Sequence, residues 1–182
     1  PQKGTIHRWI SLPASFAPWQ EVALKARVAG YIKKITVDKG DAVTQGQKLI
    51  EIEVPELEAD LIRHRAEVNV AEIEVKRLHE ARVKSPDLIL PQAVDDAEAK
   101  LAIAKATLER ATTLLAFAQI NAPFAGTVSA RKVDPGAYSA AGGDTLLQLI
   151  DASTLRLQVP VVEMETMFLK PGEQVEARVD AL

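Results

Sequence analysis

The sequence predicts an α+β fold, in which a β-sandwich made of two half-motifs is split by a long antiparallel α-helical coiled-coil hairpin. A pattern of short strands and glycine turns occurs twice, at 26–54 and at 122–151. A heptad pattern of apolar residues fills the interval between the two copies, and a short break at 83–91 ("VKSPDLILP") divides it into two segments. These three observations place a helical hairpin inside the sandwich.

The two copies repeat the same turns and the same apolar positions. The first reads "ARVAGYIKKITVDKGDAVTQGQKLIEIEV" and the second "APFAGTVSARKVDPGAYSAAGGDTLLQLID". Apolar and polar residues alternate in the strands, and a half-sheet this small cannot bury its apolar face alone. We therefore expect the copies to pack face to face, with glycines where turns need positive φ or close backbone approach. The matched turn glycines are Gly30, Gly40 and Gly46 in the first copy and Gly126, Gly136 and Gly143 in the second.

The interval between the copies carries one apolar seam in each of two predicted helices of about 26 residues, spaced as in a coiled coil. The break contains Pro86 and Pro91 and is short, so the two helices must be antiparallel neighbours, with Pro91 in the first turn of the second helix. The first seam consists of Leu57, Leu61, His64, Val68, Ala71, Val75, Leu78 and Arg82. The second seam consists of Val94, Ala97, Leu101, Ala104, Leu108, Ala111 and Leu115.

The first predicted helix has a partial second apolar stripe. A two-stranded coiled coil needs only one stripe on each helix. The second stripe is either ordinary variation of a helix surface or a contact face for a further partner, such as a neighbouring hairpin. Its members are Ala59, Ile62, Ala66, Val70 and Ile73.

The composition argues against several classes of function. The net charge of −3 gives no reason to expect nucleic-acid binding, and the absence of cysteine excludes disulfides and thiol nucleophiles. No apolar run approaches the roughly 20 residues of a membrane-spanning helix. Acidic residues lie one helical turn from basic ones, as in Glu72/Lys76 and Asp96/Lys100, which is typical of a solvated helix. We therefore predict that the chain is not an enzyme.

With these features in this order, the chain resembles the periplasmic adaptor subunits of bacterial efflux pumps, the membrane fusion proteins of the HlyD/RND-adaptor type. The half-motifs "VALKARVAGYIKKITVDKGDAVTQGQKLIEIE" and "INAPFAGTVSARKVDPGAYSAAGGDTLLQLID" look like the halves of a split lipoyl domain. The tail "STLRLQVPVVEMETMFLKPGEQVEARVDA" resembles the beginning of the family's β-barrel domain. In that tail we predict a strand, a short helix, a turn and a second strand, "QVEARVDAL".

The resemblance implies a domain organisation for the whole chain. A lipoyl-like sandwich would be split by the hairpin, and a partial β-barrel would form from the two ends. The expected segments are a lead-in or partial barrel strand at 1–20, a first lipoyl half-motif at 21–55, the hairpin at 56–117, a second half-motif at 118–153, and the truncated start of the barrel at 154–182.

The resemblance also implies a function and partners. Such adaptors bridge an inner-membrane transporter, with the RND type preferred here, and an outer-membrane channel, and they self-associate into a ring, usually of six copies. They carry no cofactor and take part in transmembrane transport without making or breaking bonds. We expect a periplasmic location, with an anchor to the inner membrane in a segment outside this chain.

The predicted hairpin tip departs from the family pattern. Many adaptors of drug pumps have an Arg, Leu, Ser trio near the tip, and the matching positions here are His79, Val83 and Leu90. Arg77 and Leu78 lie nearby but out of register, and Leu90 lacks the hydroxyl that would cap the second helix. The residues that we expect to contact a partner at the tip are Ser85, Pro86, Asp87, Leu88 and Leu90.

Two other functions compete with the adaptor. A biotin or lipoate carrier domain would need a lysine between the half-motifs, but 53–56 contains none, so we interpret Lys33, Lys34, Lys39 and Lys48 as surface charges. A purely structural coiled-coil scaffold would not need the lipoyl-like repeat. We predict no metal site: His7, His64 and His79 are scattered, His64 would be a partly exposed seam residue, and the pair Met164 and Met167 is interpreted as core filling.

Overall fold

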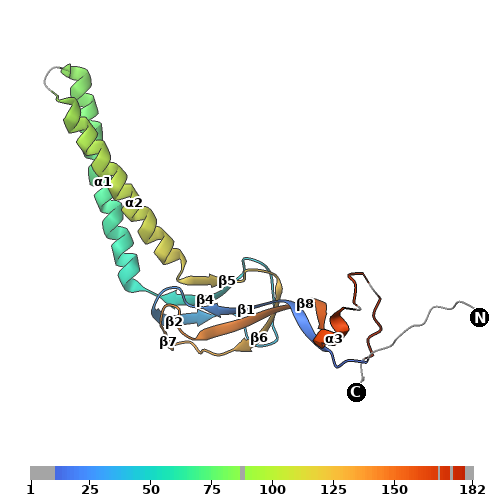
Figure 1. Cartoon of the computed structure of the whole chain (residues 1–182). Coiled ribbons are helices and arrows are strands. Elements are labelled where there is room, and N and C mark those ends of the chain that lie inside the picture. The colour runs from blue at the N-terminus through green and yellow to red at the C-terminus, as the bar shows by residue number, and fades with distance from the viewer. Residues whose placement is uncertain (1–10, 87–88, 168, 173, 179–182) are drawn as a thin grey trace, which may run out of the picture.

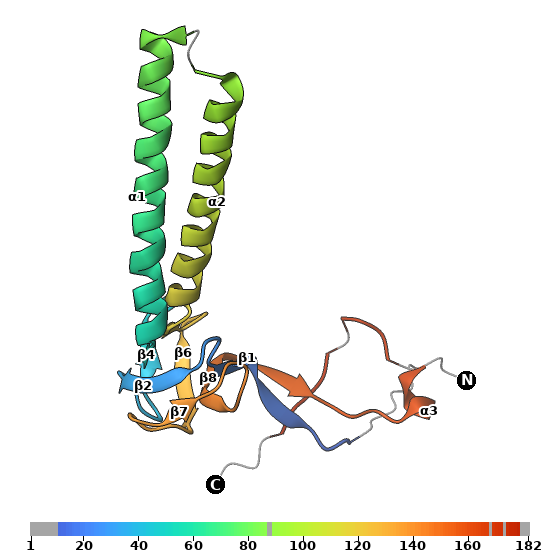
Figure 2. The same cartoon turned by 90° about the vertical axis from the view of Figure 1, so that its left-hand side faces the viewer.

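The computed structural model describes residues 11–86, 89–167, 169–172 and 174–178. A small β-structure carries a two-helix hairpin that projects from one side of it (Figure 1). The long strands β1 and β8 leave this β-structure in another direction, toward the short helix α3 (Figure 2). The tip residues Asp87 and Leu88, together with His7, lie outside the described residues.

The β-structure consists of two four-stranded sheets. One sheet has the order β1 (Ser15–Lys25), β8 (Thr145–Gln158), β6 (Gly126–Arg131) and β3 (Ala42–Val43). The other has the order β5 (Gln119–Asn121), β4 (Lys48–Glu53), β2 (Gly30–Ile35) and β7 (Tyr138–Ser139). Each sheet contains strands from both copies of the repeat, so neither copy forms a complete sheet by itself.

Backbone hydrogen bonds between the copies follow the repeat. The Gly40 N–H donates to the Val128 carbonyl at 2.8 Å, and the Gly136 N–H donates to the Ile32 carbonyl at 2.8 Å. Each residue of the second bond lies 96 positions from its counterpart in the first. The two copies are therefore arranged reciprocally, and each donates a backbone hydrogen bond to a strand of the other.

One turn glycine differs from the sequence alignment. Gly40, Gly46 and Gly136 have φ values of 97°, 80° and 87°, and the fourth glycine with positive φ in the sandwich is Gly142, at 68°. The alignment paired Gly46 with Gly143, and that pairing is wrong by one residue. The second copy is one residue longer than the first in this region, and the structure places the additional residue after Gly142, where φ is no longer positive, and not before it.

Two other glycines are required by close approach. A Cβ on Gly30 would lie 2.5 Å from the Glu53 carbonyl oxygen, and a Cβ on Gly126 would lie 2.3 Å from the Ile150 carbonyl oxygen. Real Cβ atoms do not approach a backbone oxygen so closely, so each site accepts only glycine without a shift of the neighbouring strand.

The apolar core lies between the two sheets and draws on both copies. Ile32, Leu49 and Ile50 from the first copy and Leu147 and Leu149 from the second are at most 1% exposed. Burial of one such side chain stabilises the fold by about 1.5–3 kcal/mol. The predicted α+β fold, a β-sandwich split by a hairpin, is confirmed, but the copies do not only pack face to face: each also places a short strand, β3 or β7, in the other copy's sheet.

The hairpin consists of α1 (Pro55–Lys84) and α2 (Pro91–Ala116), of 30 and 26 residues. Proline stands in the first turn of both helices, where its missing N–H costs no hydrogen bond. At 1.5 Å per residue, α1 is about 45 Å long and α2 about 39 Å. The first helix is longer than the predicted 26 residues because it continues to Lys84.

The first and last strands, β1 and β8, pair with each other both within the sandwich and beyond it. β1 and β8 are antiparallel from Ser15↔Gln158 to Lys25↔Thr145, with irregularities between Pro18 and Gln20 and between Leu24 and Lys25. The helix α3 (Glu163–Thr166) follows, but the described part of the second predicted strand, 174–178, is not a strand. A strand needs a neighbour for its backbone hydrogen bonds, and no strand of the described residues pairs with it.

Candidate partner-binding hairpin

The base of the hairpin is continuous with the sandwich core. Strands β4 and β5, which precede α1 and follow α2, pair antiparallel through Ile50↔Ile120. The Ile52 N–H also donates to the Ala118 carbonyl at 2.8 Å, just beyond the end of α2. Leu57 and Leu115, from the first turn of α1 and the last turn of α2, pack against the buried core. Both helices are therefore fixed in direction where they leave the sheet.

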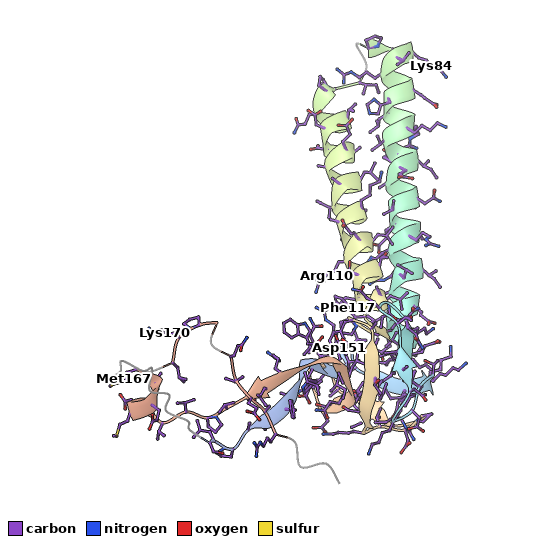
Figure 3. All side chains as sticks on the ribbon, turned by 90° about the vertical axis from the view of Figure 1, so that its right-hand side faces the viewer. Lys84, Arg110, Phe117, Asp151, Met167 and Lys170 are labelled. Carbon is purple, nitrogen blue, oxygen red and sulfur yellow. The ribbon has the colours of Figure 1, made fainter. Side chains whose placement is uncertain are left out.

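An aromatic ring covers the end of α2 at this base. Phe117 is the C-cap residue of α2, and the guanidinium carbon of Arg27 lies 3.9 Å from the centre of its ring. This distance is typical of a cation–π contact. Phe117 lies where the hairpin joins the sandwich (Figure 3), so the contact ties the loop before β2 to the hairpin.

The predicted seams lie between the helices, with one exception. In α1, Arg82 is exposed and Ala81 is half-buried instead. Arg82 lies near the tip end of α1, where its long side chain is exposed. Of the other predicted seam residues, Val68, Val94, Ala97 and Ala111 are buried, and Leu57, Leu61, His64, Ala71, Val75, Leu78, Leu101, Ala104, Leu108 and Leu115 are half-buried.

Two polar contacts join the helices and define their register. His79 Nε2 lies 2.8 Å from Glu98 Oε1, and Lys105 Nζ lies 2.9 Å from Glu72 Oε1. Seven residues separate the contacts on each helix, so the two helices run antiparallel without slipping over this length. Because these contacts fix the register, each residue of α1 can be matched to the residue of α2 that lies beside it.

The seam histidine is bound by its own helix. His64 Nδ1 lies 2.9 Å from Glu67 Oε2, and the Arg63 guanidinium lies 3.3 Å from His64 Nε2. The side chain of His64 is 14% exposed, more deeply placed than the Glu67 carboxylate at 48%. The histidine thus fills a seam position while its polar atoms reach partners at the helix surface.

The described part of the tip is apolar and open. Val83 and Leu90 are 83% and 73% exposed. Ser85 ends α1, where its N–H donates to the Ala81 carbonyl at 2.8 Å, and Pro86 is exposed. Leu90 is the N-cap residue of α2 and makes no side-chain cap hydrogen bond, as its lack of a hydroxyl predicts. His79 stands at the position of the trio's Arg, and its side chain contacts Glu98 within the hairpin.

The lysines that a carrier domain could use lie elsewhere. Residues 53–56, between the half-motifs, form the end of β4 and the start of α1, so no exposed turn exists there to present a lysine. Lys33 and Lys48 lie 2.8 Å and 2.5 Å from Glu51. Hydrogen bonds from Lys33 and then Lys48 lower the pKa of Glu51 to about 2. Both lysines are therefore engaged in surface ion pairs on the sheet.

One arginine links equivalent turns of the two copies. Arg131 Nε lies 3.0 Å from Asp38 Oδ1, and Arg131 Nη1 lies 2.5 Å from Asp134 Oδ1. Asp38 and Asp134 are 96 positions apart and hold matching places in the repeat. The Lys39 N–H and then the Arg131 guanidinium lower the pKa of Asp38. On this side of the sandwich, ion pairs join the two copies in addition to the backbone hydrogen bonds.

The methionine pair does not fill a core. Met164 and Met167 are 80% and 75% exposed on α3, so the interpretation as core residues is wrong. The reason is that α3 packs no apolar face against the sandwich core. Over the residues that the structure describes, no cluster of three or more histidine, aspartate or glutamate side chains is arranged to hold a metal ion.

One surface feature was missed in the sequence. The rings of Tyr31 and Tyr138 meet edge to face at 5.3 Å, and both residues are more than half exposed. They are opposite each other in the pairing of β2 with β7. The pairing of β3 with β6 is equivalent in the repeat, and there Ala42 and Thr127, the counterparts of Tyr138 and Tyr31, lie opposite each other.

Among the described residues, no helix combines the length and the apolar character needed to cross a lipid bilayer. Many of the exposed residues of the long helices α1 and α2 are charged.

A two-sheet sandwich whose halves exchange strands, with a coiled-coil hairpin inserted between them, defines the barrel-sandwich hybrid class. The family model described as "RND MFP, barrel-sandwich hybrid domain" matches residues 20–159. The chain belongs to this family of membrane fusion proteins, and the family predicted from the sequence is confirmed.

The relatives agree with this assignment. The chain is 29% identical to the macrolide export protein MacA of Escherichia coli O157:H7, over 85% of this chain and 49% of that protein. It is 25% identical to the multidrug resistance protein MdtE of Escherichia coli K12, over 94% of this chain and 48% of that protein. The chain thus spans about half the length of the curated relatives it matches.

Solved structures show the same fold. A MacA–MexA chimeric protein with the Pseudomonas aeruginosa MexA α-hairpin domain superimposes with a TM-score of 0.77 at 26% identity, covering 85% of this chain and 54% of that one. The membrane fusion protein Spr0693 of Streptococcus pneumoniae R6 gives a TM-score of 0.73 at 21% identity, covering 89% of this chain and 75% of that one.

Proposed function

We propose that this chain is part of a periplasmic adaptor subunit of a tripartite efflux pump, which bridges an inner-membrane transporter and an outer-membrane channel. The observation that carries the proposal is the hairpin of about 45 Å, fixed at its base in the sandwich core through Leu57 and Leu115. A rigid projection of this length suits a protein that must reach a partner. The membership in the RND membrane fusion proteins supports an RND transporter as the preferred inner-membrane partner.

The adaptor role does not include the choice of substrate. The relatives are named for macrolide export, multidrug resistance and nickel–cobalt–cadmium resistance. Because proteins with similar chains serve such different substrates, we infer that the transporter selects what is exported. The chain itself then contributes reach and contact surfaces, and it makes or breaks no bond.

Within this role, the tip contacts the channel and the seam keeps the hairpin stiff. Ser85, Pro86 and Leu90 occupy the described part of the tip, and Asp87 and Leu88 complete it in the sequence. The exposed apolar side chain of Leu90 supports a contact that differs from the family's Arg, Leu, Ser trio. The seam residues hold the tip at a fixed distance, and the turn glycines hold the sandwich that carries it. Several copies, six in the usual arrangement, form the ring.

The test uses the full-length gene product in its own host. Deletion of the gene should raise sensitivity to a compound that the pump exports, and the wild-type gene should restore resistance. Ser85→Cys, labelled through its thiol with a maleimide–benzophenone photo-cross-linker, should be joined on irradiation to an outer-membrane channel protein, identified by mass spectrometry, whereas the same label on Cys at Gln119, on the sandwich, should not. If deletion leaves export of all tested compounds unchanged and Ser85→Cys finds no channel, the adaptor role is refuted. A biotin or lipoate adduct in the intact mass would instead establish the carrier function.

A further inference from the structure

Strands β1 and β8 continue beyond the sandwich as a two-stranded ribbon. Inside the sandwich, β8 lies between β1 and β6, and its pairing with β6 reaches Ile150. Farther along, residues 155–158 of β8 pair with residues 15–18 of β1, in a part that we call the distal ribbon. All of its residues are described, and none of them belongs to the buried core or packs against it. Two strands alone are only marginally stable, so the direction of the distal ribbon depends on contacts at its root.

The root of the distal ribbon is a large bulge. Pro18 pairs with Leu155, but Gln20, two residues farther on, pairs with Asp151. Trp19 alone therefore stands opposite the three residues 152–154 of β8. A bulge bends its strand and increases the local twist. This one sets the direction in which the distal ribbon leaves the sandwich toward α3 (Figure 2).

Arg156 of β8 reaches across the ribbon to two residues of β1 at this bulge. Its Nε and Nη2 each donate to the Pro18 carbonyl, at 3.3 Å. Its guanidinium carbon lies 5.7 Å from the centre of the Trp19 ring, within the range of a cation–π contact. Arg156 pairs with Ala17, two residues before Trp19, and residues two apart point to the same side of a strand. The arginine thus joins β8 to both β1 residues at the point where the register changes.

The β8 side of the bulge is also held by a side chain. Asp151 Oδ1 accepts a hydrogen bond from the Ser153 N–H at 2.9 Å. Hydrogen bonds from the Ser153 hydroxyl and then from its N–H lower the pKa of Asp151. Asp151 lies where β8 leaves the sandwich (Figure 3). Side chains therefore hold both strands at the bulge, in addition to the backbone ladder.

We propose that Arg156 and Trp19 are a positioning pair, which fixes the angle between the distal ribbon and the hairpin. The planar guanidinium donates twice to the Pro18 carbonyl while it also contacts the Trp19 ring, a combination that lysine cannot reproduce. Trp19 is 50% exposed and Arg156 is exposed, so the loss of either side chain should leave the sandwich folded. The proposal rests on the proposed function, in which the hairpin reaches one partner and the rest of the adaptor faces the other.

Distances between two spin labels test the positioning pair directly. The chain has no cysteine, so the labels can be attached to Lys132→Cys on the sandwich and to Gln158→Cys on the distal ribbon. The full-length protein is used, with any cysteine elsewhere replaced by serine. Double electron–electron resonance should give one narrow distance distribution. Arg156→Ala or Trp19→Ala should increase its width about twofold, because the ribbon then pivots at the bulge. An unchanged width in either variant overturns the proposal.

Two further variants separate positioning from charge and from aromatic bulk. Arg156→Lys keeps the positive charge but loses the planar group with its two donors, so it should broaden the distribution as Arg156→Ala does. Phe16→Ala removes the other exposed aromatic side chain of β1 and should leave the width unchanged. A narrow distribution in Arg156→Lys overturns the proposal, as does equal broadening by Phe16→Ala and Trp19→Ala. Circular dichroism should be the same in all variants, and a loss of folded structure in Arg156→Ala would instead show a general structural role and overturn the positioning pair.

The outcomes separate the positioning pair from the adaptor role. If deletion of the gene raises sensitivity but the alanine variants keep the narrow distribution, the positioning pair is refuted and the adaptor role stands. If the alanine variants broaden the distribution but deletion leaves export of all tested compounds unchanged, the positioning pair is supported and the adaptor role is refuted.

Discussion

Gly126 on β6 lies against the backbone of Ile150 on β8, so closely that a Cβ on Gly126 would be 2.3 Å from the Ile150 carbonyl oxygen. Gly126→Ala should therefore push the two strands apart and lower the free energy of unfolding by about 2–3 kcal/mol. Chemical denaturation followed by circular dichroism measures the loss. Ser129→Ala, on the same strand, is the control and should cost much less. Equal stability of Gly126→Ala and the wild type would contradict the close approach.

Leu101 lies in the seam of the hairpin, half-buried between the helices. Leu101→Asp places a charge there and should destabilise the hairpin by about 3 kcal/mol, because the carboxylate finds no partner at the seam. The expected result is a loss of helical signal in circular dichroism and of channel docking, with the sandwich still folded. Ala102→Asp, one residue away and exposed, should leave the helical signal unchanged. Full helicity in Leu101→Asp would argue against the seam.

Leu90 begins α2 without a side-chain cap. Leu90→Ser supplies a hydroxyl that can accept a hydrogen bond from a free N–H of the first turn, and it should stabilise the start of α2 by about 1 kcal/mol. Hydrogen exchange of the first amides of α2 measures the effect. Leu90→Ala, which removes the exposed side chain without adding a cap, should leave exchange nearly as in the wild type. If serine and alanine behave alike, the start of α2 is not limited by its cap.

Glu51 lies between Lys33 and Lys48, and their hydrogen bonds lower its pKa from 4.5 to about 2. A carboxylate whose pKa is lowered in the folded state stabilises the fold fully above its unfolded pKa, and this contribution is lost as the pH falls. The loss should therefore occur between about pH 4.5 and pH 2, and Glu51→Gln should lack this part of the acid dependence. Carboxyl chemical shifts in NMR give the pKa directly. A midpoint near 4.5 would show that the two lysines do not hold the carboxylate.

Much of the fold follows from local patterns in the sequence. The alternation in the strands and the heptads of the helices each report on burial within one element, and Pro91 marks where α2 begins. The pairing of β2 with β7 and of β3 with β6 is different, since partners such as Gly30 and Ser139 are far apart in the chain and share no local signal. The repeat showed that the copies meet, but it did not show that each sheet takes strands from both.

The predictions that were wrong also depend on features that no local pattern in the sequence reveals. Gly142 and Gly143 are adjacent, and only the backbone conformation shows which one has positive φ. Arg82 fits the heptad count, but it lies near the tip end of α1, where its side chain is exposed. Met164 and Met167 have the spacing of core residues, and their exposure depends on what packs against α3. The Arg27 contact with Phe117 joins parts of the chain that no pattern relates.

The hairpin leaves the sandwich from β4 and returns to it in β5, and these two strands are direct neighbours in one sheet. The ends of the inserted segment are thus held side by side whatever its length. Evolution can add or remove heptads in α1 and α2 in equal number, or replace the whole segment, without disturbing the strands below. The reach of the hairpin can therefore change to match a different partner while the sandwich stays constant.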